Sequence, residues 1–170
     1  MNNWKENSLL ASRKLNLLSS EEINKVLLAL ADKAEEQCDA LLVENEKDLS
    51  AMDKSNPLYD RLLLTKQRIF DIASDIRKVA SLPTPLGKTL ESRELPNGLK
   101  LTKKAVPFGV IGIIYEARPN VSFDVFSLCF KTANVCVLKG GTDAYNSNFA
   151  IVNLIKEVLR EHNLDENMVH

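Results

Sequence analysis

Two short segments of this 170-residue chain carry side chains that could bind or activate an anionic small molecule. Arg118 and Asn120 follow the apolar run Val110 to Tyr115, and a helix beginning at Pro119 would add unpaired backbone N–H groups and the positive end of its dipole. A guanidinium can clamp a phosphate or carboxylate, and an amide can donate to a developing oxyanion. The residues alone leave two plainer roles open, a surface ion pair for Arg118 and a helix N-cap for Asn120.

The second segment is Lys139-Gly140-Gly141, which follows another short β-branched run. Two glycines let the backbone approach a ligand closely before the next helix starts, which suits a phosphate or ribose. Any tight turn between a strand and a helix can also use such a pair, and the segment matches neither dinucleotide nor P-loop glycine motifs. Lys139 could equally be a solvated lysine at a strand end.

The elements around these segments alternate as strand, helix, strand, helix. The expected ranges are Val110 to Tyr115, Pro119 to Ala133, Asn134 to Lys139 and Thr142 to His162. The first strand is nearly all apolar, as expected for a parallel strand covered by helices on both faces. A crossover of this kind makes the two strands parallel, so both chemical segments should lie at one edge and shape one pocket there. Along the first of these helices we expect the side bearing Val121, Val125, Leu128 and Thr132 to be its apolar side.

The residues before Leu82 have helical periodicity. We expect a first helix from Asn2 to Leu15, and a second that opens with a Ser19/Glu22 capping box and whose apolar face continues to Leu42. A third runs from Lys66 to Ala80. Between residues 88 and 106, two polar runs flank Asn97-Gly98 and predict a β-hairpin that projects from the core, where its strands can pair with another subunit.

The charge balance, the cysteines and the histidines limit which classes of function the chain can have. The 22 basic and 23 acidic residues give a formal net charge of -1, so we expect a small-molecule partner and no binding to nucleic acid or membrane. No signal sequence or spanning segment is evident, which makes the cytoplasm the expected compartment. Cys38, Cys129 and Cys136 look like buried, inert thiols, and His162 and His170 have no metal-ligand spacing, so no metal site is expected.

Three runs of residues resemble a known family. PFGVIGIIYEARPNV (residues 107–121), SLCFKTAN (127–134) and VLKGG (137–141) are similar to gamma-glutamyl phosphate reductase, also called glutamate-5-semialdehyde dehydrogenase, of the aldehyde dehydrogenase superfamily. Weaker agreement covers almost the whole chain and includes Asn45, Asp48, residues 61–65 and Ser147-Asn148. Ala133 departs from the family, which usually has glycine there, so the helix end is expected to differ locally.

The resemblance implies an α/β fold with N-terminal helices, a projecting β-hairpin and a partial Rossmann-like parallel sheet of the aldehyde dehydrogenase type. It implies an NADP(H)-dependent reduction of gamma-glutamyl phosphate to glutamate 5-semialdehyde and phosphate, a step of proline biosynthesis. Asn120 would be the oxyanion donor, Arg118 would bind substrate, and Lys139, Gly140 and Gly141 would bind cofactor. Arginine is common at the position of Lys139, which leaves the choice between NADPH and NADH open.

Family members are more than twice as long, and their catalytic cysteine would fall beyond His170. We therefore expect an N-terminal portion that is inactive alone and forms a homo-oligomer when full length. Its parts would be residues 1–87, the helical part of the cofactor-binding domain; 88–106, an oligomerisation-type hairpin; and 107–170, a truncated NADP-binding domain. Two alternatives stay open: a non-catalytic assembly or regulatory module, and another aldehyde dehydrogenase with a different acyl substrate.

Overall fold

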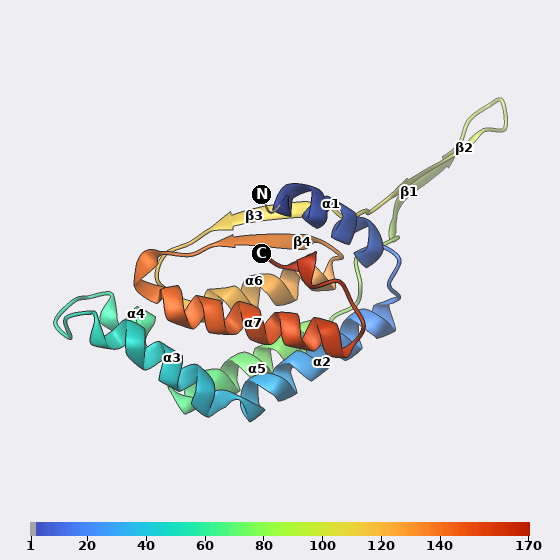
Figure 1. The fold of residues 1–170 in the computed structure, drawn as a ribbon. Coiled ribbons are helices and arrows are strands. Elements are labelled where there is room, and N and C mark those ends of the chain that lie inside the picture. Colours follow the sequence, from blue (N-terminus) through green and yellow to red (C-terminus); the bar gives the residue numbers. More distant parts are fainter. Residues whose placement is uncertain (1–2) are drawn as a thin grey trace.

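The computed structural model describes residues 3–170 (Figure 1). Its helices are α1 (Trp4–Leu15), α2 (Ser20–Glu36), α3 (Cys38–Ser50), α4 (Tyr59–Leu62), α5 (Lys66–Ser81), α6 (Pro119–Lys131) and α7 (Tyr145–Glu161), with short 3-10 turns η1 (Thr142–Ala144) and η2 (Glu166–Met168). Its strands are β1 (Thr89–Glu94), β2 (Lys100–Lys104), β3 (Val110–Ile114) and β4 (Val135–Lys139). Within this part of the chain, no helix is both long and apolar enough to cross a bilayer. The expected start of the first helix at Asn2 lies outside the described residues.

The fold is layered around the parallel pair β3–β4. Helices α6 and α7 lie between this sheet and the pair α2 and α5, while α1 packs beside the strands (Figure 1). Residues from all of these elements share one hydrophobic core, whose largest fully buried side chains include Phe123, Phe126 and Phe130 of α6. The predicted parallel crossover is confirmed, and Val169 forms a parallel bridge to Cys136 of β4. His170 continues this pairing, since its N–H donates to the Cys136 carbonyl at 3.0 Å.

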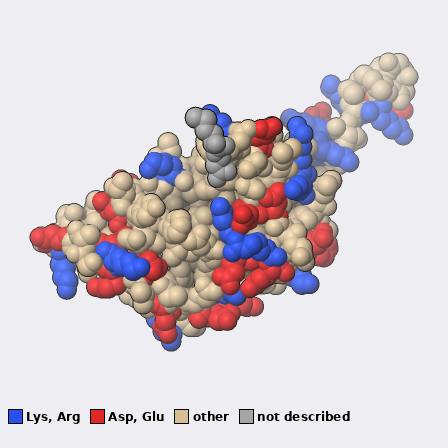
Figure 2. Space-filling view, viewed as in Figure 1, with Lys and Arg blue, Asp and Glu red and all other residues tan. Residues whose placement is uncertain are grey.

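The predicted hairpin is also confirmed. Strands β1 and β2 pair antiparallel, and every residue in both is exposed. Gly98 has φ 84°, a left-handed conformation that glycine adopts without steric cost. The hairpin extends away from the helical layers (Figure 1), and lysine and arginine side chains line it (Figure 2).

The second predicted helix is wrong in its length, because it is interrupted at Gln37. Gln37 has φ -94° and ψ 19°, and it ends α2 and begins α3. The capping box at the start of α2 is present: the Glu22 backbone N–H donates to Ser19 Oγ at 3.2 Å, and the Ser19 N–H donates to Glu22 Oε2 at 2.7 Å. The apolar periodicity crosses the break because both helices turn that face to the same core, so periodicity alone could not reveal it.

Two expectations about burial are wrong. Strand β3 is covered on one face only: Ile111 and Ile113 pack against the core, whereas Ile114 is 86% exposed. Val110 on the same face is also exposed, so the apolar composition of the strand overstated its burial. Helix α6 buries its three phenylalanines rather than the expected side, on which Leu128 is 53% exposed. Aromatic side chains bury more apolar area than the aliphatic ones opposite them.

Candidate functional site

The ends of β3 and β4 place both predicted chemical segments at one edge of the sheet. Ile114 is in register with Lys139, and the Tyr115 N–H donates to the Lys139 carbonyl at 3.1 Å. The turn after β3 leads directly into α6, and the turn after β4 leads through η1 into α7. The prediction of a shared edge is therefore confirmed.

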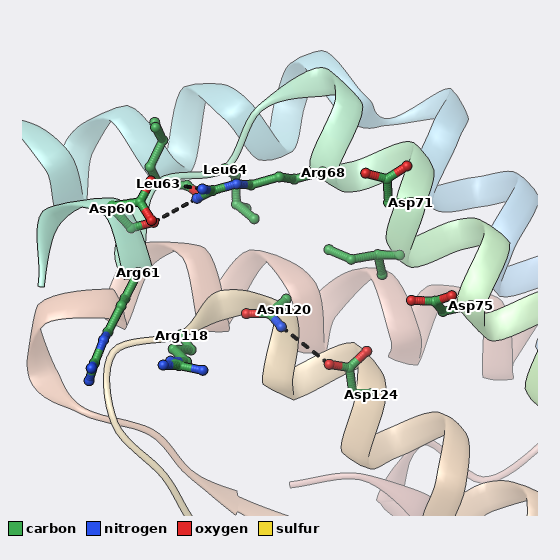
Figure 3. Close-up of a pocket in the computed structure, with 11 residues that line it drawn as sticks. Asp60, Arg61, Leu63, Leu64, Arg68, Asp71, Asp75, Arg118, Asn120 and Asp124 are labelled. Carbon is green, nitrogen blue, oxygen red and sulfur yellow. Dashed lines mark hydrogen bonds and ion pairs between the residues drawn. The ribbon is translucent and has the colours of Figure 1, made fainter.

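A hollow of about 390 Å³ lies between α5 and the first turns of α6; we call it the α5–α6 hollow (Figure 3). Asn120 and Arg118 line it, together with charged residues of α4 and α5. The Asn120 amide donates to Asp124 Oδ2 at 3.2 Å, and helix α6 has no side-chain cap. The N-cap interpretation of Asn120 is therefore wrong, and its amide lies at the wall of the hollow, one helical turn before a carboxylate.

Arg118 is exposed at the mouth of this hollow. Its neighbour Glu116 pairs with Arg61 at 3.2 Å, and none of the ion pairs within residues 3–170 includes Arg118. The guanidinium is thus available to an anion. Sequence reasoning missed the carboxylates of the hollow, although the spacing of Asn120 and Asp124 on one helix face was a visible signal.

Lys139, Gly140 and Gly141 line a second hollow, which also has a volume of about 390 Å³ and runs along α7; we call it the α7 hollow. Tyr145 and Phe149 stack there with ring centroids 6.1 Å apart. Two ammonium groups, those of Lys139 and Lys156, lie among its residues, and Lys139 donates to the Gly140 carbonyl at 3.1 Å. Flat apolar surface beside cationic groups suits a ligand that has both rings and phosphates.

Close packing restricts Gly140 more than Gly141. A Cβ at Gly140 would lie 2.4 Å from Asn148 Nδ2 and 3.2 Å from the Tyr115 ring. A Cβ at Gly141 would lie 3.4 Å from the backbone nitrogen of Ala117, in the turn after β3. Gly140 therefore lets the turn after β4 pack closely against Tyr115 and Asn148, whereas a side chain at Gly141 would make ordinary contact with the turn after β3.

The expectation of one shared pocket is wrong, because Asn120 and Lys139 line different hollows. Tyr115 and Ser122 share a hydrogen bond of 2.6 Å, and Ser122 donates to Asn148 Oδ1 at 2.9 Å. Burial raises the pKa of Tyr115, so its hydroxyl keeps its proton near neutral pH. These three side chains, from the first turn, α6 and α7, form a hydrogen-bonded wall at the α7 hollow, which Tyr115 and Asn148 line.

The three cysteines do not supply a nucleophile to either hollow. All are buried, and none lines the α5–α6 or the α7 hollow. Burial raises the pKa of Cys38, and a hydrogen bond with Cys129 together with burial raises that of Cys136. Cys38 and Cys136 are therefore weak nucleophiles. The hydrogen bond with Cys136 lowers the pKa of Cys129, but that thiol is buried away from both hollows. Within residues 3–170, no group of three His, Cys, Asp or Glu is arranged to hold a metal ion.

Curated proteins named gamma-glutamyl phosphate reductase match nearly all of the chain. Those of Bacteroides thetaiotaomicron and Chlorobium chlorochromatii are 58% and 57% identical over 159 and 160 residues. These matches cover 94% of this chain and 38% of each relative. The chain is a homologue of gamma-glutamyl phosphate reductase. It spans about two fifths of the length of these reductases, and no family model matches it.

Solved structures agree. The reductases of Thermotoga maritima and Saccharomyces cerevisiae superpose with TM-scores of 0.92 and 0.91 over 98% of this chain, at 34% and 26% identity. They are covered over 41% and 44% of their lengths. A probable aldehyde dehydrogenase from Listeria monocytogenes has a TM-score of 0.71 at 16% identity, which shows the fold alone. The expected α/β fold of the aldehyde dehydrogenase type is confirmed.

Several residues of the weaker resemblance to the reductases form a buried network rather than a binding surface. Asn45 donates to the Leu62 carbonyl at 2.9 Å and to Ser147 Oγ at 3.0 Å, and it accepts from the Leu64 N–H at 2.8 Å. Asp48 accepts from the Ser147 N–H and hydroxyl at 2.8 and 2.6 Å. This carboxylate stabilises the start of α7 and thereby fixes the helix that walls the α7 hollow.

Proposed function

We propose that this chain forms one part of an NADPH-dependent reductase that converts gamma-glutamyl phosphate to glutamate 5-semialdehyde and phosphate, a step of proline biosynthesis. The observation that supports it best is the pair of hollows at one sheet edge. One hollow offers an amide donor and a free guanidinium, and the other offers lysines, glycines and aromatic rings.

In this proposal the α7 hollow holds the dinucleotide. The residues fit it: Gly140 and Gly141 line the hollow without side chains, and Lys139 and Lys156 offer cationic groups to phosphate or ribose oxygens. When bound, the cofactor supplies the hydride. Tyr115 and Asn148 form the wall that fixes the depth of the hollow.

The α5–α6 hollow holds the acyl phosphate. Asn120 donates its amide N–H to the oxygen on which negative charge develops, and Arg118 binds an anionic group of the substrate. The nucleophilic cysteine is supplied from outside these 170 residues, because the three thiols present are buried away from both hollows. The projecting hairpin pairs with another subunit in the complete protein, which forms a homo-oligomer.

Binding and turnover by this chain test the two halves of the proposal. NADPH titrated into the chain should bind, and Lys139→Ala should weaken binding about tenfold, because one charge-assisted contact is lost. The matched control is Lys54→Ala, which removes an exposed lysine elsewhere. NADPH should also bind more tightly than NADH.

The same chain mixed with NADPH and gamma-glutamyl phosphate should show no oxidation of NADPH. Turnover would overturn the claim that the nucleophile lies elsewhere. Equal NADPH affinity of Lys139→Ala and the unaltered chain would overturn the placement of the dinucleotide.

A further inference from the structure

Asn148 of α7 presents a hydrogen-bond donor to the α7 hollow that has no partner there. Its side chain lines the hollow, and its Oδ1 atom accepts a hydrogen bond from Ser122 Oγ at 2.9 Å. Within residues 3–170, no group accepts a hydrogen bond from its Nδ2 atom. In the same part of the chain, the only buried side-chain nitrogen or oxygen without a hydrogen bond is His170 Nε2. The Asn148 Nδ2 atom is therefore accessible to solvent or to a ligand.

The hydrogen bonds at Ser122 set the direction in which this amide points. A hydroxyl has one hydrogen, and Ser122 donates it to Asn148 Oδ1. Tyr115 is therefore the donor in its 2.6 Å bond with Ser122. Ser122 is fully buried, so water does not compete for these two bonds. The side-chain oxygen of Asn148 stays engaged, and its N–H groups are turned away from Ser122.

Gly140 leaves room beside the Nδ2 atom. A Cβ at residue 140 would lie 2.4 Å from Asn148 Nδ2, which is too close for two nonbonded atoms. The absence of a side chain at Gly140 thus lets the turn after β4 pass directly beside the amide. Both residues line the α7 hollow. A ligand that approaches the glycine backbone therefore also approaches this donor.

The surroundings of the donor favour a ligand that is rich in acceptor oxygens. Lys139 and Lys156 offer ammonium groups to the same hollow, and Tyr145 and Phe149 offer aromatic faces. Within the described residues, no aspartate or glutamate lines this hollow. An amide N–H among ammonium groups has only donors beside it, so a ligand oxygen is the acceptor that it needs.

We propose that Asn148 donates an amide N–H to a phosphate or ribose oxygen of the dinucleotide, and that Ser122 is the positioning residue for this amide. This role rests on the proposed function, which places the dinucleotide in the α7 hollow, and it adds a binding contact there. The bond from Ser122 keeps the donor turned toward the ligand before binding. Less freedom is then lost when the ligand binds, which raises affinity.

Asn148→Asp tests the donor with little change of shape. The new carboxylate still accepts from Ser122 through one oxygen and places a second oxygen where Nδ2 was. NADPH titrated into the ¹⁵N-labelled chain should bind at least about tenfold more weakly to this variant, because a hydrogen bond is lost and like charges approach. Asn153→Asp makes the same charge change at an exposed position of α7 and should leave binding unchanged. In the unaltered chain, NADPH should shift the side-chain N–H signals of Asn148.

Ser122→Ala tests the positioning role, because it removes the bond to Oδ1 and leaves Asn148 in place. NADPH binding should weaken about threefold to fivefold. In an Asn148→Ala background the same change should have no further effect, since no amide is left to position, whereas a general loss of packing would weaken binding in both backgrounds. Ser127→Ala is the control: this buried hydroxyl of α6 donates to the Asp124 carbonyl of its own helix at 2.9 Å.

Equal NADPH affinity of Asn148→Asp and the unaltered chain, or side-chain N–H signals of Asn148 that do not move, would overturn the donor. The same loss from Ser122→Ala in both backgrounds would overturn the positioning role. The amide spectrum reports whether each variant is folded, and Asn148→Ala alone, expected to weaken binding about fivefold, is a second variant. If Lys139→Ala weakens binding and the Asn148 variants do not, this inference alone fails. If NADPH does not bind the unaltered chain, the dinucleotide site itself fails.

Discussion

The sequence around Asn120 is compatible with two roles, a helix N-cap and a hydrogen-bond donor to a ligand, and the neighbouring side chains decide between them. An asparagine beside a helix start is a common N-cap, yet here its amide bonds to Asp124 and faces a hollow. The preceding Arg118 occupies the cap position in its place. A side chain released from capping is free to reorient toward a ligand, which agrees with the proposed role as oxyanion donor.

Gly140→Ala tests whether the glycine turn shapes the α7 hollow. The new Cβ would lie 2.4 Å from Asn148 Nδ2, so the Tyr115–Ser122–Asn148 wall must shift. Overpacking of this kind costs about 1–3 kcal/mol, and we expect NADPH binding to weaken about tenfold in fluorescence titrations. Gly112→Ala is the control, since a Cβ there meets nothing within 4 Å. Equal effects of the two substitutions would contradict a specific role for Gly140.

At the scale of elements, the residue with a left-handed backbone conformation after α6 is alanine and not glycine. Ala133 has φ 53°, and the Asn134 N–H donates back to the Cys129 carbonyl at 2.8 Å. The sequence expectation that this helix end differs locally is therefore wrong: the cap geometry is present, and alanine bears its steric cost. The bond from Asn134 and the buried position of both residues hold it in place.

Ala133→Gly should stabilise the chain. A left-handed conformation costs alanine roughly 1–2 kcal/mol, and part of this gain is offset because glycine loses more freedom on folding. A net increase of about 0.5–1 kcal/mol in the free energy of unfolding is expected in urea titrations. Asn163, with φ 57° after α7, offers the matched substitution Asn163→Gly, which should be nearly neutral because asparagine tolerates this conformation. A destabilised Ala133→Gly would refute the account.

At the scale of the whole molecule, ion pairs join the outer helices to the layers beneath them. Arg77 of α5 donates to Glu35 of α2 at 2.6 Å, and Lys33 of α2 pairs with Glu157 and Glu161 of α7 at 2.9 and 2.8 Å. Hydrogen bonds from Arg77 hold the pKa of Glu35 below its ordinary value of 4.5, and those from Lys33 and Gln37 do the same for Glu157. These contacts depend on ionised carboxylates.

Stability should therefore fall in acid. Because the folded-state pKa of Glu35 is lower than its unfolded-state value, its contribution is present above about pH 4.5 and is lost as the pH falls through the folded-state pKa. Glu35→Gln should be less stable than the unaltered chain at about pH 7, and the difference should shrink toward about pH 3 in chemical denaturation. The exposed Glu36→Gln is the control. A difference that is independent of pH would show that the carboxylate charge is not involved.

The sequence by itself determined the local elements and the edge where they meet. Proline at the start of α6, the capping box of α2 and the Asn-Gly turn act through neighbouring backbone groups, so their effects are readable in order along the chain. Crossover handedness then placed Asn120 and Lys139 at one edge. Only the tertiary structure decided that they line different hollows, that Gln37 breaks a helix, and that Asp71, Asp75 and Asp124 line one hollow. These outcomes depend on contacts between residues far apart in the chain, which no local pattern encodes.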